Sequence, residues 1–140
     1  MEIVITSLVD LKKSQHNRPH EFVKYLSKNH NITVLSINDW WKGNQDDHEK
    51  NCLDFGDIFE KIDYRYITHK KIPLFLQEFY PTNEVKKIYE SNFDIHFNYN
   101  SMIIGYKFSN KFKTILDLAD DIPSMIRHTP QIPRPINLFA

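Results

Sequence analysis

The sequence predicts an α/β domain of three layers, with a mostly parallel sheet and helices on both of its faces. Short runs rich in β-branched residues alternate along the chain with longer stretches in which apolar residues recur at helical spacing. The chain has 140 residues, 41% of them hydrophobic, which suffices for one core and leaves little room for a second. Strands that alternate with helices form parallel sheets with right-handed crossovers, so the order of the elements predicts the architecture.

The first 37 residues have the order and lengths of one βαβ unit. Residues Glu2–Ser7 (EIVITS) are typical of a buried parallel strand. A helix is expected from about Pro19, capped by Asn17 or Arg18. Its apolar face would consist of Phe22, Val23, Tyr25 and Leu26. A second buried strand, Ile32–Ile37 (ITVLSI), completes the unit.

The rest of the chain continues the alternation. Residues 38–56 are polar and acidic, and we expect them to form a surface excursion. The predicted elements that follow are a half-buried edge strand at Ile62–Thr68, helical segments within Ile72–Ser91, a strand at Phe93–Phe97, a helix at Met102–Phe112 and a strand at Thr114–Leu118. We expect one domain over residues 1–128, and we interpret the Pro-rich residues 129–140 as a connector or tail.

Charge and cysteine content exclude several classes of protein. The chain has 18 Lys+Arg and 18 Asp+Glu, so it lacks the basic excess with which nucleic-acid binders neutralise phosphates, and we expect no nucleic-acid partner. The single cysteine, Cys52, cannot form an intramolecular disulfide, which favours the cytoplasm. No run approaches the roughly 18 to 20 apolar residues of a membrane helix, so any membrane contact would be peripheral, at the inner face.

Several well-known catalytic and ligand-binding motifs are missing. The seven histidines form neither an H-x-x-x-H nor an H-x-H pair, which argues against a zinc site. There is no G-x-S-x-G nucleophile turn and no phosphate-binding loop of the G-x-x-x-x-G-K type. The loop after the first strand contains no glycine, which excludes a tight pyrophosphate turn. We therefore expect no metal and no cofactor to be bound by this domain alone.

The topology directs attention to three loops. In open parallel sheets, ligands bind at the carboxyl ends of the strands, near the point where the strand order reverses. The segments expected there are Leu8–Arg18, Asn98–Ser101 and Asp117–Asp121. Within the second of them, Asn98 and Asn100 supply polar side chains at the end of a strand.

The start of the first helix is a candidate anion site. Arg18, His16 and His20 lie beside backbone N–H groups that could hold a phosphate or carboxylate. The alternative, a capped surface helix with solvated neighbours, is the interpretation that we favour, because most helix N-termini bind only caps and water.

An acidic cluster follows the last predicted strand. Asp117, Asp120 and Asp121 could ligate magnesium, although capping of the next helix by Asp120 or Asp121 is the favoured interpretation. Asp117 differs because it interrupts an apolar strand. Its burial requires a hydrogen-bonding partner or a position facing a cleft.

Three phrases of the sequence occur together in an informative order and spacing. They are EIVITS followed by Asn17–Ser36, then FDIHFNYNS at Phe93–Ser101, then KTILDLADDIP at Lys113–Pro123. In combination they resemble the N-terminal domain of family 4 glycosyltransferases, retaining enzymes with two Rossmann-like domains, known as the GT-B fold. The resemblance implies a Rossmann-like domain with a cleft at the carboxyl ends of its strands. The cleft-lining residues that we expect are Arg18, His16, Asn98, Asn100, Asp117 and Asp120.

The resemblance also implies a division of labour. In that family the N-terminal domain binds the acceptor, and the C-terminal domain binds the nucleotide-sugar donor and carries an E-x7-E element. This chain would then be the acceptor-side half, inactive without a donor-binding domain or separate subunit, with a sugar or lipid-linked acceptor. Two departures from the family pattern are the absence of a Gly-Gly pair in the first loop and Ala119 in place of a common histidine.

A protein of another class is the alternative. A noncatalytic α/β interaction module would have a similar pattern of elements. A phosphorylated receiver domain fits poorly, because Asp10 is the one acid near the end of the first strand. An unpaired sheet edge would favour a homodimer in either class.

Overall fold

The computed structural model describes residues 1–8, 10–12, 16, 18–37, 56–67, 82–101 and 103–117. Five strands and four helices lie within these ranges. In chain order they are β1 (Glu2–Ser7), α1 (Arg18–Leu26), β2 (Asn31–Ile37), α2 (Gly56–Phe59), β3 (Asp63–Ile67), α3 (Asn83–Glu90), β4 (Ile95–Tyr99), α4 (Ile103–Ser109) and β5 (Thr114–Asp117).

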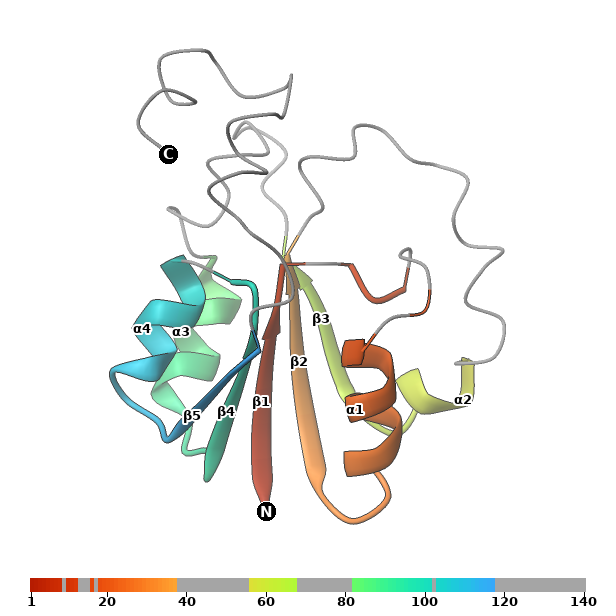
Figure 1. The fold of residues 1–140 in the computed structure, drawn as a ribbon. Coiled ribbons are helices and arrows are strands. Elements are labelled where there is room, and N and C mark those ends of the chain that lie inside the picture. The colour runs from red at the N-terminus through yellow and green to blue at the C-terminus, as the bar shows by residue number, and fades with distance from the viewer. Residues whose placement is uncertain are drawn as a thin grey trace.

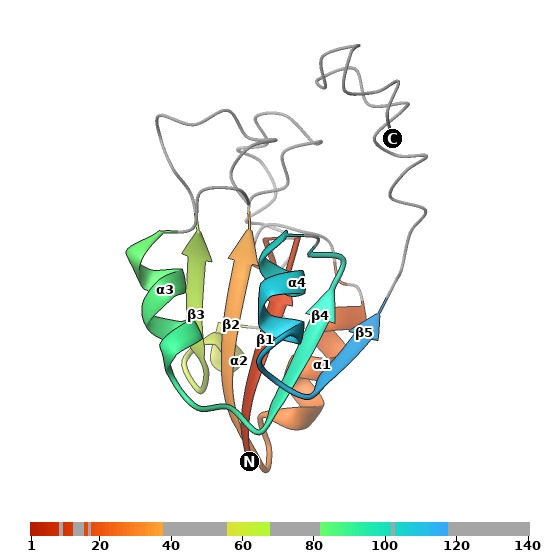
Figure 2. The same ribbon diagram turned by 90° about the vertical axis from the view of Figure 1, so that its left-hand side faces the viewer.

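The five strands form one sheet in the order β3-β2-β1-β4-β5, and all neighbouring strands are parallel. Figure 1 shows α1 and α2 on one side of the sheet and α3 and α4 on the other, and Figure 2 looks onto the α3 and α4 side. The predicted three-layer, Rossmann-like α/β fold is therefore confirmed for the described residues. The strand order reverses between β1 and β4, so the topological switch point lies at the carboxyl ends of these two strands.

Alternate residues of each strand face opposite helical layers. Ile5 and Phe97 belong to the core under α1, where the Phe22 and Phe97 rings pack with centroids 4.7 Å apart. Val4 belongs to the other core, which is shared with α3 and α4. Both faces of the central strand are thus buried, as expected for a parallel sheet covered on both sides.

Some element boundaries differ from the predicted ones. Tyr25 was expected on the buried face of α1 but is 71% exposed, and the face that packs is Phe22, Val23 and Leu26. The four-residue helix α2 was not predicted: its first residue, Gly56, ends the expected surface excursion, and the rest of it was assigned to no element. The helix α3 begins only at Asn83, where the Thr82 hydroxyl oxygen accepts a hydrogen bond from the Val85 amide at 3.3 Å.

The fourth strand lies two residues later than predicted, at Ile95–Tyr99 rather than Phe93–Phe97. The Asp94 amide donates to the Glu2 carbonyl at 2.9 Å, and the Glu2 amide donates to the Asp94 carboxylate at 2.9 Å, which fixes where this chain segment joins the sheet. Phe93 instead packs against the α3 and α4 core. Asn98 therefore lies inside the strand instead of in the loop after it.

The predicted boundary between residues 128 and 129, the predicted helix after residue 121 and all of the predicted surface excursion at 38–56 except Gly56 lie outside the described residues. None of the described helices is long and apolar enough to cross a membrane.

Candidate functional site

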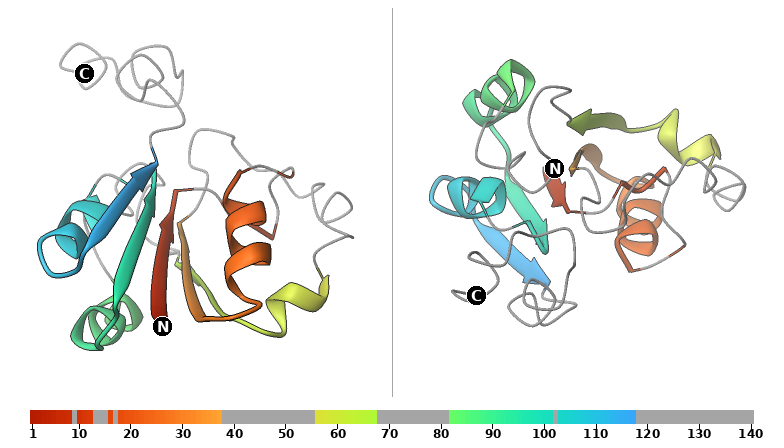
Figure 3. Two further views of the ribbon diagram at one scale, coloured as in Figure 1. Left: turned by 60° about the horizontal axis from the view of Figure 1, so that its bottom comes forward. Right: turned by 90° about the horizontal axis from the view of Figure 1, so that it is seen from above.

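The carboxyl ends of β1, β4 and β5 lie side by side, and Figure 3 shows this end of the sheet from above. The Leu8 amide donates to the Tyr99 carbonyl at 3.1 Å, which joins the segments that leave β1 and β4. Polar side chains reach this end from three directions: the first loop, the turn after β4, and the last residue of β5.

Asp117, the last described residue of β5, pairs with the first residue of α1. The Arg18 Nη1 atom lies 3.2 Å from Asp117 Oδ1, and the two side chains are 57% and 15% exposed. The partner required for an acid in this apolar strand is thus supplied from a helix about 100 positions earlier in the chain. The other carboxylate oxygen, Oδ2, is buried and has no hydrogen-bond partner among the described residues.

His16 lies close to this pair but is engaged elsewhere. Its Nε2 atom is 2.7 Å from Glu21 Oε1, and its ring stacks on the ring of His20 with centroids 5.5 Å apart. The His20 side chain is buried and Nε2 donates to the Leu11 carbonyl at 2.7 Å, because a carbonyl can only accept. His20 therefore ties the first loop to α1, and Arg18 is an exposed basic group at the start of this helix.

The turn after β4 is held by Asn98. The Asn98 Nδ2 atom donates to the Ser101 carbonyl at 2.9 Å, and Oδ1 accepts from the Ser101 amide at 3.0 Å. The Ser101 hydroxyl oxygen in turn accepts from the Gly105 amide at 2.9 Å, in the first turn of α4. Asn98 is 6% exposed, so its amide organises the turn from beneath.

Asn100 lies within this turn with φ at 57°, the left-handed region that Asn tolerates better than most residues. Its side chain is buried, at 5% exposure. Both asparagines expected to line a cleft are thus buried at the predicted end of the sheet. Asp120, the remaining predicted site residue, lies outside the described residues.

The Asn98 side chain also requires a glycine opposite it. A Cβ atom at Gly105 would lie 2.3 Å from Asn98 Nδ2, well inside any allowed contact. Because the Asn98 amide is fixed by Ser101 on both of its polar atoms, it has little freedom to retreat. Gly105 therefore lets α4 approach β4 closely enough for the turn to form.

A buried histidine extends this network across the sheet. His96 Nδ1 lies 2.9 Å from Thr114 Oγ1 on β5, and Nε2 lies 2.8 Å from Thr6 Oγ1 on β1. The Thr114 hydroxyl donates to the Phe112 carbonyl at 3.1 Å, and the Thr6 hydroxyl donates to Asn98 Oδ1 at 3.1 Å, so both threonines link His96 to further polar groups. Burial lowers the pKa of His96 to about 4, which keeps the ring neutral.

The first loop forms a second closed cluster that sequence reasoning missed. Asp10 is 4% exposed, and its Oδ1 atom accepts from the Lys12 amide at 3.0 Å and from the hydroxyl of Tyr64. Burial, followed by the adjacent Asp10 carboxylate, raises the pKa of Tyr64, so the phenol stays protonated and remains a donor. The Lys12 Nζ atom lies 4.7 Å from the centroid of the Tyr64 ring.

Asp10 could have been suspected from its position just after a buried strand. Its partner could not, because Tyr64 lies 54 positions away in a strand that pairs with neither β1 nor its loop. The cluster closes the loop over the α1 face, where Leu11 joins the core.

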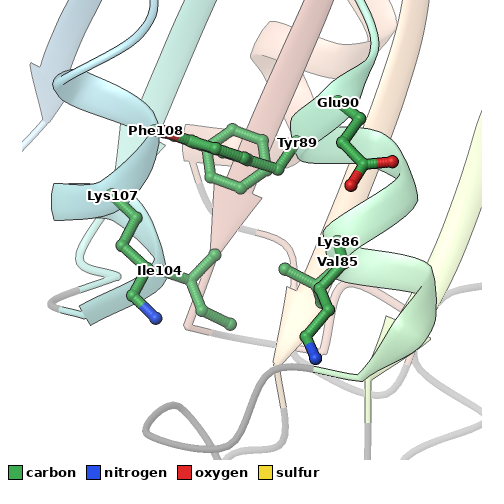
Figure 4. Close-up of a pocket in the computed structure, with 7 residues that line it drawn as sticks. All are labelled: Val85, Lys86, Tyr89, Glu90, Ile104, Lys107 and Phe108. Atoms are coloured by element: carbon green, nitrogen blue, oxygen red, sulfur yellow. The ribbon is translucent and has the colours of Figure 1, made fainter.

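A groove on the opposite face of the molecule offers a different kind of surface. Its volume is about 380 Å³, and Figure 4 shows that it is formed between α3 and α4. The residues that line it are Val85, Lys86, Tyr89, Glu90, Ile104, Lys107 and Phe108. The floor is apolar and the charged groups come from the exposed sides of the helices, so the groove suits an apolar side chain better than it suits acid–base chemistry.

Among the described residues, no group of three or more His, Cys, Asp or Glu side chains is arranged to hold a metal ion. No protein-family model matches the chain, and searches of the curated proteins and of the solved structures find no significant match. The candidate site is therefore defined by its geometry: an exposed arginine, a carboxylate with one oxygen that has no donor among the described residues, and a hydrogen-bonded turn, all at the carboxyl end of a parallel sheet.

Proposed function

We propose that this chain is the acceptor-side half of a retaining GT-B glycosyltransferase, which transfers a sugar only together with a domain or subunit that binds the nucleotide-sugar donor. The observation that carries the proposal is the Arg18–Asp117 pair at the carboxyl end of the sheet. It occurs on a fold of the Rossmann type, at the strand end where the sequence resembles the acidic position of that family.

The geometry suggests how an acceptor would be held. Asp117 has an oxygen without a donor among the described residues, and a sugar hydroxyl is a donor of suitable size. Arg18 is more than half exposed, so rotation of its side chain would open the carboxylate to the acceptor. Arg18 would then bind a second acceptor oxygen, and the pair would orient the hydroxyl that attacks the donor sugar.

Localisation follows from this role and is part of the same proposal. A nucleotide-sugar donor is a cytoplasmic substrate, so the half-enzyme would work in the cytoplasm, at the inner membrane face if its acceptor is linked to a lipid.

The experiment is a transfer assay with and without a donor-binding partner. The chain alone should neither transfer sugar from UDP-glucose or GDP-mannose nor bind these donors. Co-expression with a donor-binding domain that carries E-x7-E should give turnover, and Asp117→Asn in this chain should reduce that turnover at least tenfold. Robust transfer by the chain alone, or full activity of the Asp117→Asn complex, would contradict the proposal.

A noncatalytic interaction module is the second candidate, and the apolar groove between α3 and α4 is the observation that favours it. Under that hypothesis the groove would bind a partner and Asp117 would be dispensable. Substitution of Tyr89 by Asp, at a groove-lining residue that is 36% exposed, should then abolish partner binding while Asp117→Asn leaves it unchanged. The opposite pattern would favour the half-enzyme.

A further inference from the structure

The strand β5 is an open edge of the sheet among the described elements. Ile115 and Leu116 are 53% and 55% exposed, and they point to opposite faces because they are consecutive in a strand. The other edge, β3, is protected: the Arg65 guanidinium pairs with Asp63 through Nε and Nη2, at 3.0 and 2.9 Å. Charged side chains on an edge strand discourage pairing, and apolar ones favour it.

The hydrogen bonds between β4 and β5 determine which residues of β5 direct their backbone groups toward β4 and which direct them toward the open edge. The His96 amide donates to the Lys113 carbonyl at 2.9 Å, so the backbone groups of Lys113 face β4. In a parallel ladder the two directions alternate, so Ile115 and Asp117 also face β4, while Thr114 and Leu116 present their N–H and C=O groups to the open edge.

We propose that β5 pairs with β5 of a second copy of this chain, antiparallel and about a two-fold axis through Ile115. Only registers that place Thr114 and Leu116 in hydrogen-bonded pairs use the free backbone groups. The register centred on Ile115 pairs Thr114 with the partner's Leu116 and Lys113 with the partner's Asp117. It is the one that brings opposite charges together on both sides of the axis, as an isologous interface requires.

All three residues of the central row lie on one face of the sheet. Lys113, Ile115 and Asp117 are on the α1 side, as is Phe97, which pairs with Ile115. Across the proposed axis, Lys113 therefore lies opposite the partner's Asp117, Ile115 opposite the partner's Ile115, and Asp117 opposite the partner's Lys113. On the other face, Leu116 would extend over Thr114 of the partner subunit, so both exposed apolar side chains of the edge become covered.

The size of the contact sets its expected strength. A four-residue edge with two exposed apolar side chains per copy falls below the roughly 1,200 Å² of a stable interface. We therefore expect a reversible dimer, whose population rises with protein concentration. The inference shares Asp117 with the proposed acceptor site, where this carboxylate also contacts Arg18 of its own chain. The backbone pairing of Thr114 with the partner's Leu116 and the contact of Ile115 with the partner's Ile115 do not depend on sugar transfer, so either proposal can fail alone.

Cysteine cross-linking tests the register directly. Across the proposed axis, Ile115 and the partner's Ile115 form a non-hydrogen-bonded pair with Cα atoms about 4.5 Å apart, within the range that a disulfide bridges. In a Cys52→Ser background, which removes the one native cysteine, Ile115→Cys should form a cross-linked dimer on mild oxidation. Leu116→Cys, equally exposed on the same strand, should form several-fold less because its counterpart lies two positions away.

Sedimentation of the uncrosslinked protein gives an independent result. The weight-average mass of the wild type should rise with concentration, and Ile115→Asp, which places two carboxylates at the axis, should remain monomeric. Lys87→Glu, on the exposed side of α3, should behave as the wild type. A monomeric wild type at the highest concentration, or equal cross-linking by Ile115→Cys and Leu116→Cys with both variants folded by circular dichroism, would overturn the proposal.

Discussion

Polar side chains on the two faces of β4 and β5 differ in how fully their hydrogen-bonding groups are satisfied. On the α3 and α4 face, His96, Asn98 and Thr114 bond to one another, to Thr6 and to the following turn, so their hydrogen-bonding capacity is met inside the protein. On the α1 face, Asp117 has one oxygen paired with an exposed arginine and another without a donor among the described residues. Two strands thus carry a closed polar network on one side and an open polar pair on the other.

The contrast teaches which polar residues to assign to structure and which to function. A closed network costs stability when any member is removed, because the remaining partners are left buried and unsatisfied. An ion pair whose arginine is more than half exposed is screened by solvent and contributes little, so we expect its removal to affect stability weakly and ligand binding strongly. Four predictions test this division between structural and functional polar residues, from the largest expected effect to the smallest.

The largest effect concerns His96 and pH. The pKa of His96 is about 4 in the folded protein and near 6.5 in the unfolded chain, so the unfolded chain binds one more proton between these values. The free energy of unfolding should therefore fall as the pH drops from about 6.5 to 4, by about 3 kcal/mol from this group. Urea unfolding of the wild type and of His96→Gln across this range should show the slope in the wild type only.

The control variant is His16→Gln, which replaces an exposed histidine outside the closed network and so shows the effect of removing a histidine as such. If His96→Gln keeps the slope too, the closed network does not hold the ring neutral, and the contrast between the two faces loses its strongest support.

The second prediction concerns Gly105. Replacement by Ala places a methyl group against the fixed Asn98 amide, and overpacking of this kind should cost about 1 to 3 kcal/mol in spite of the better helix propensity of Ala. Thermal unfolding measures the loss. Ser109→Ala at an exposed position of α4 should change stability by less than about 0.5 kcal/mol. A Gly105→Ala variant as stable as the wild type would mean that the turn after β4 is not rigid.

The third prediction concerns the closed first loop. Tyr64→Phe removes one donor to the buried Asp10 carboxylate, which keeps its hydrogen bond from the Lys12 amide, and the loss should cost about 1 to 2 kcal/mol. Tyr25→Phe, at a position 71% exposed, is the matched control and should be neutral. Chemical denaturation of the two variants compares them directly, and equal stabilities would show that the loop is not closed by this contact.

The smallest stability effect is expected on the open face. Asp117→Asn should change the free energy of unfolding by less than about 1 kcal/mol, because Arg18 is largely solvated and the pair is screened. The test is the combination of a small stability change with a large functional loss in the complemented transfer assay. A loss of several kcal/mol would instead place Asp117 among the structural residues.

The sequence was sufficient for the fold because the fold depends on local patterns. The runs that became β1 and β2 contain β-branched residues on both faces, and such runs occur only where a sheet is covered twice. Boundaries were less accurate where contacts between distant segments set them. The start of β4 depends on Asp94 meeting Glu2, which no local pattern reveals.

The candidate site was predicted in part for the same reason. Asp117 was recognised as needing a partner because an acid in an apolar strand is unusual, but the choice of Arg18 depends on the packing of α1 beside β5. Asn98 was expected to line a cleft and is instead buried under the turn, because the strand extends two residues further than its pattern indicated. Tyr64 and Asp10 could not be connected, since their contact spans three strands of the sheet.

The most direct test of the central claim is an acceptor titration followed by amide nuclear magnetic resonance. The probes are a panel of soluble monosaccharides and disaccharides, together with a short-chain polyprenyl-phosphate sugar in detergent, each added to the wild type and to Asp117→Asn. We predict that at least one probe shifts the amides of Arg18, Ser101 and Asp117 in the wild type, and that the shifts disappear in Asp117→Asn while its other resonances are unchanged. Shifts confined to the groove between α3 and α4, or equal shifts in both proteins, would contradict an acceptor site at the carboxyl end of the sheet.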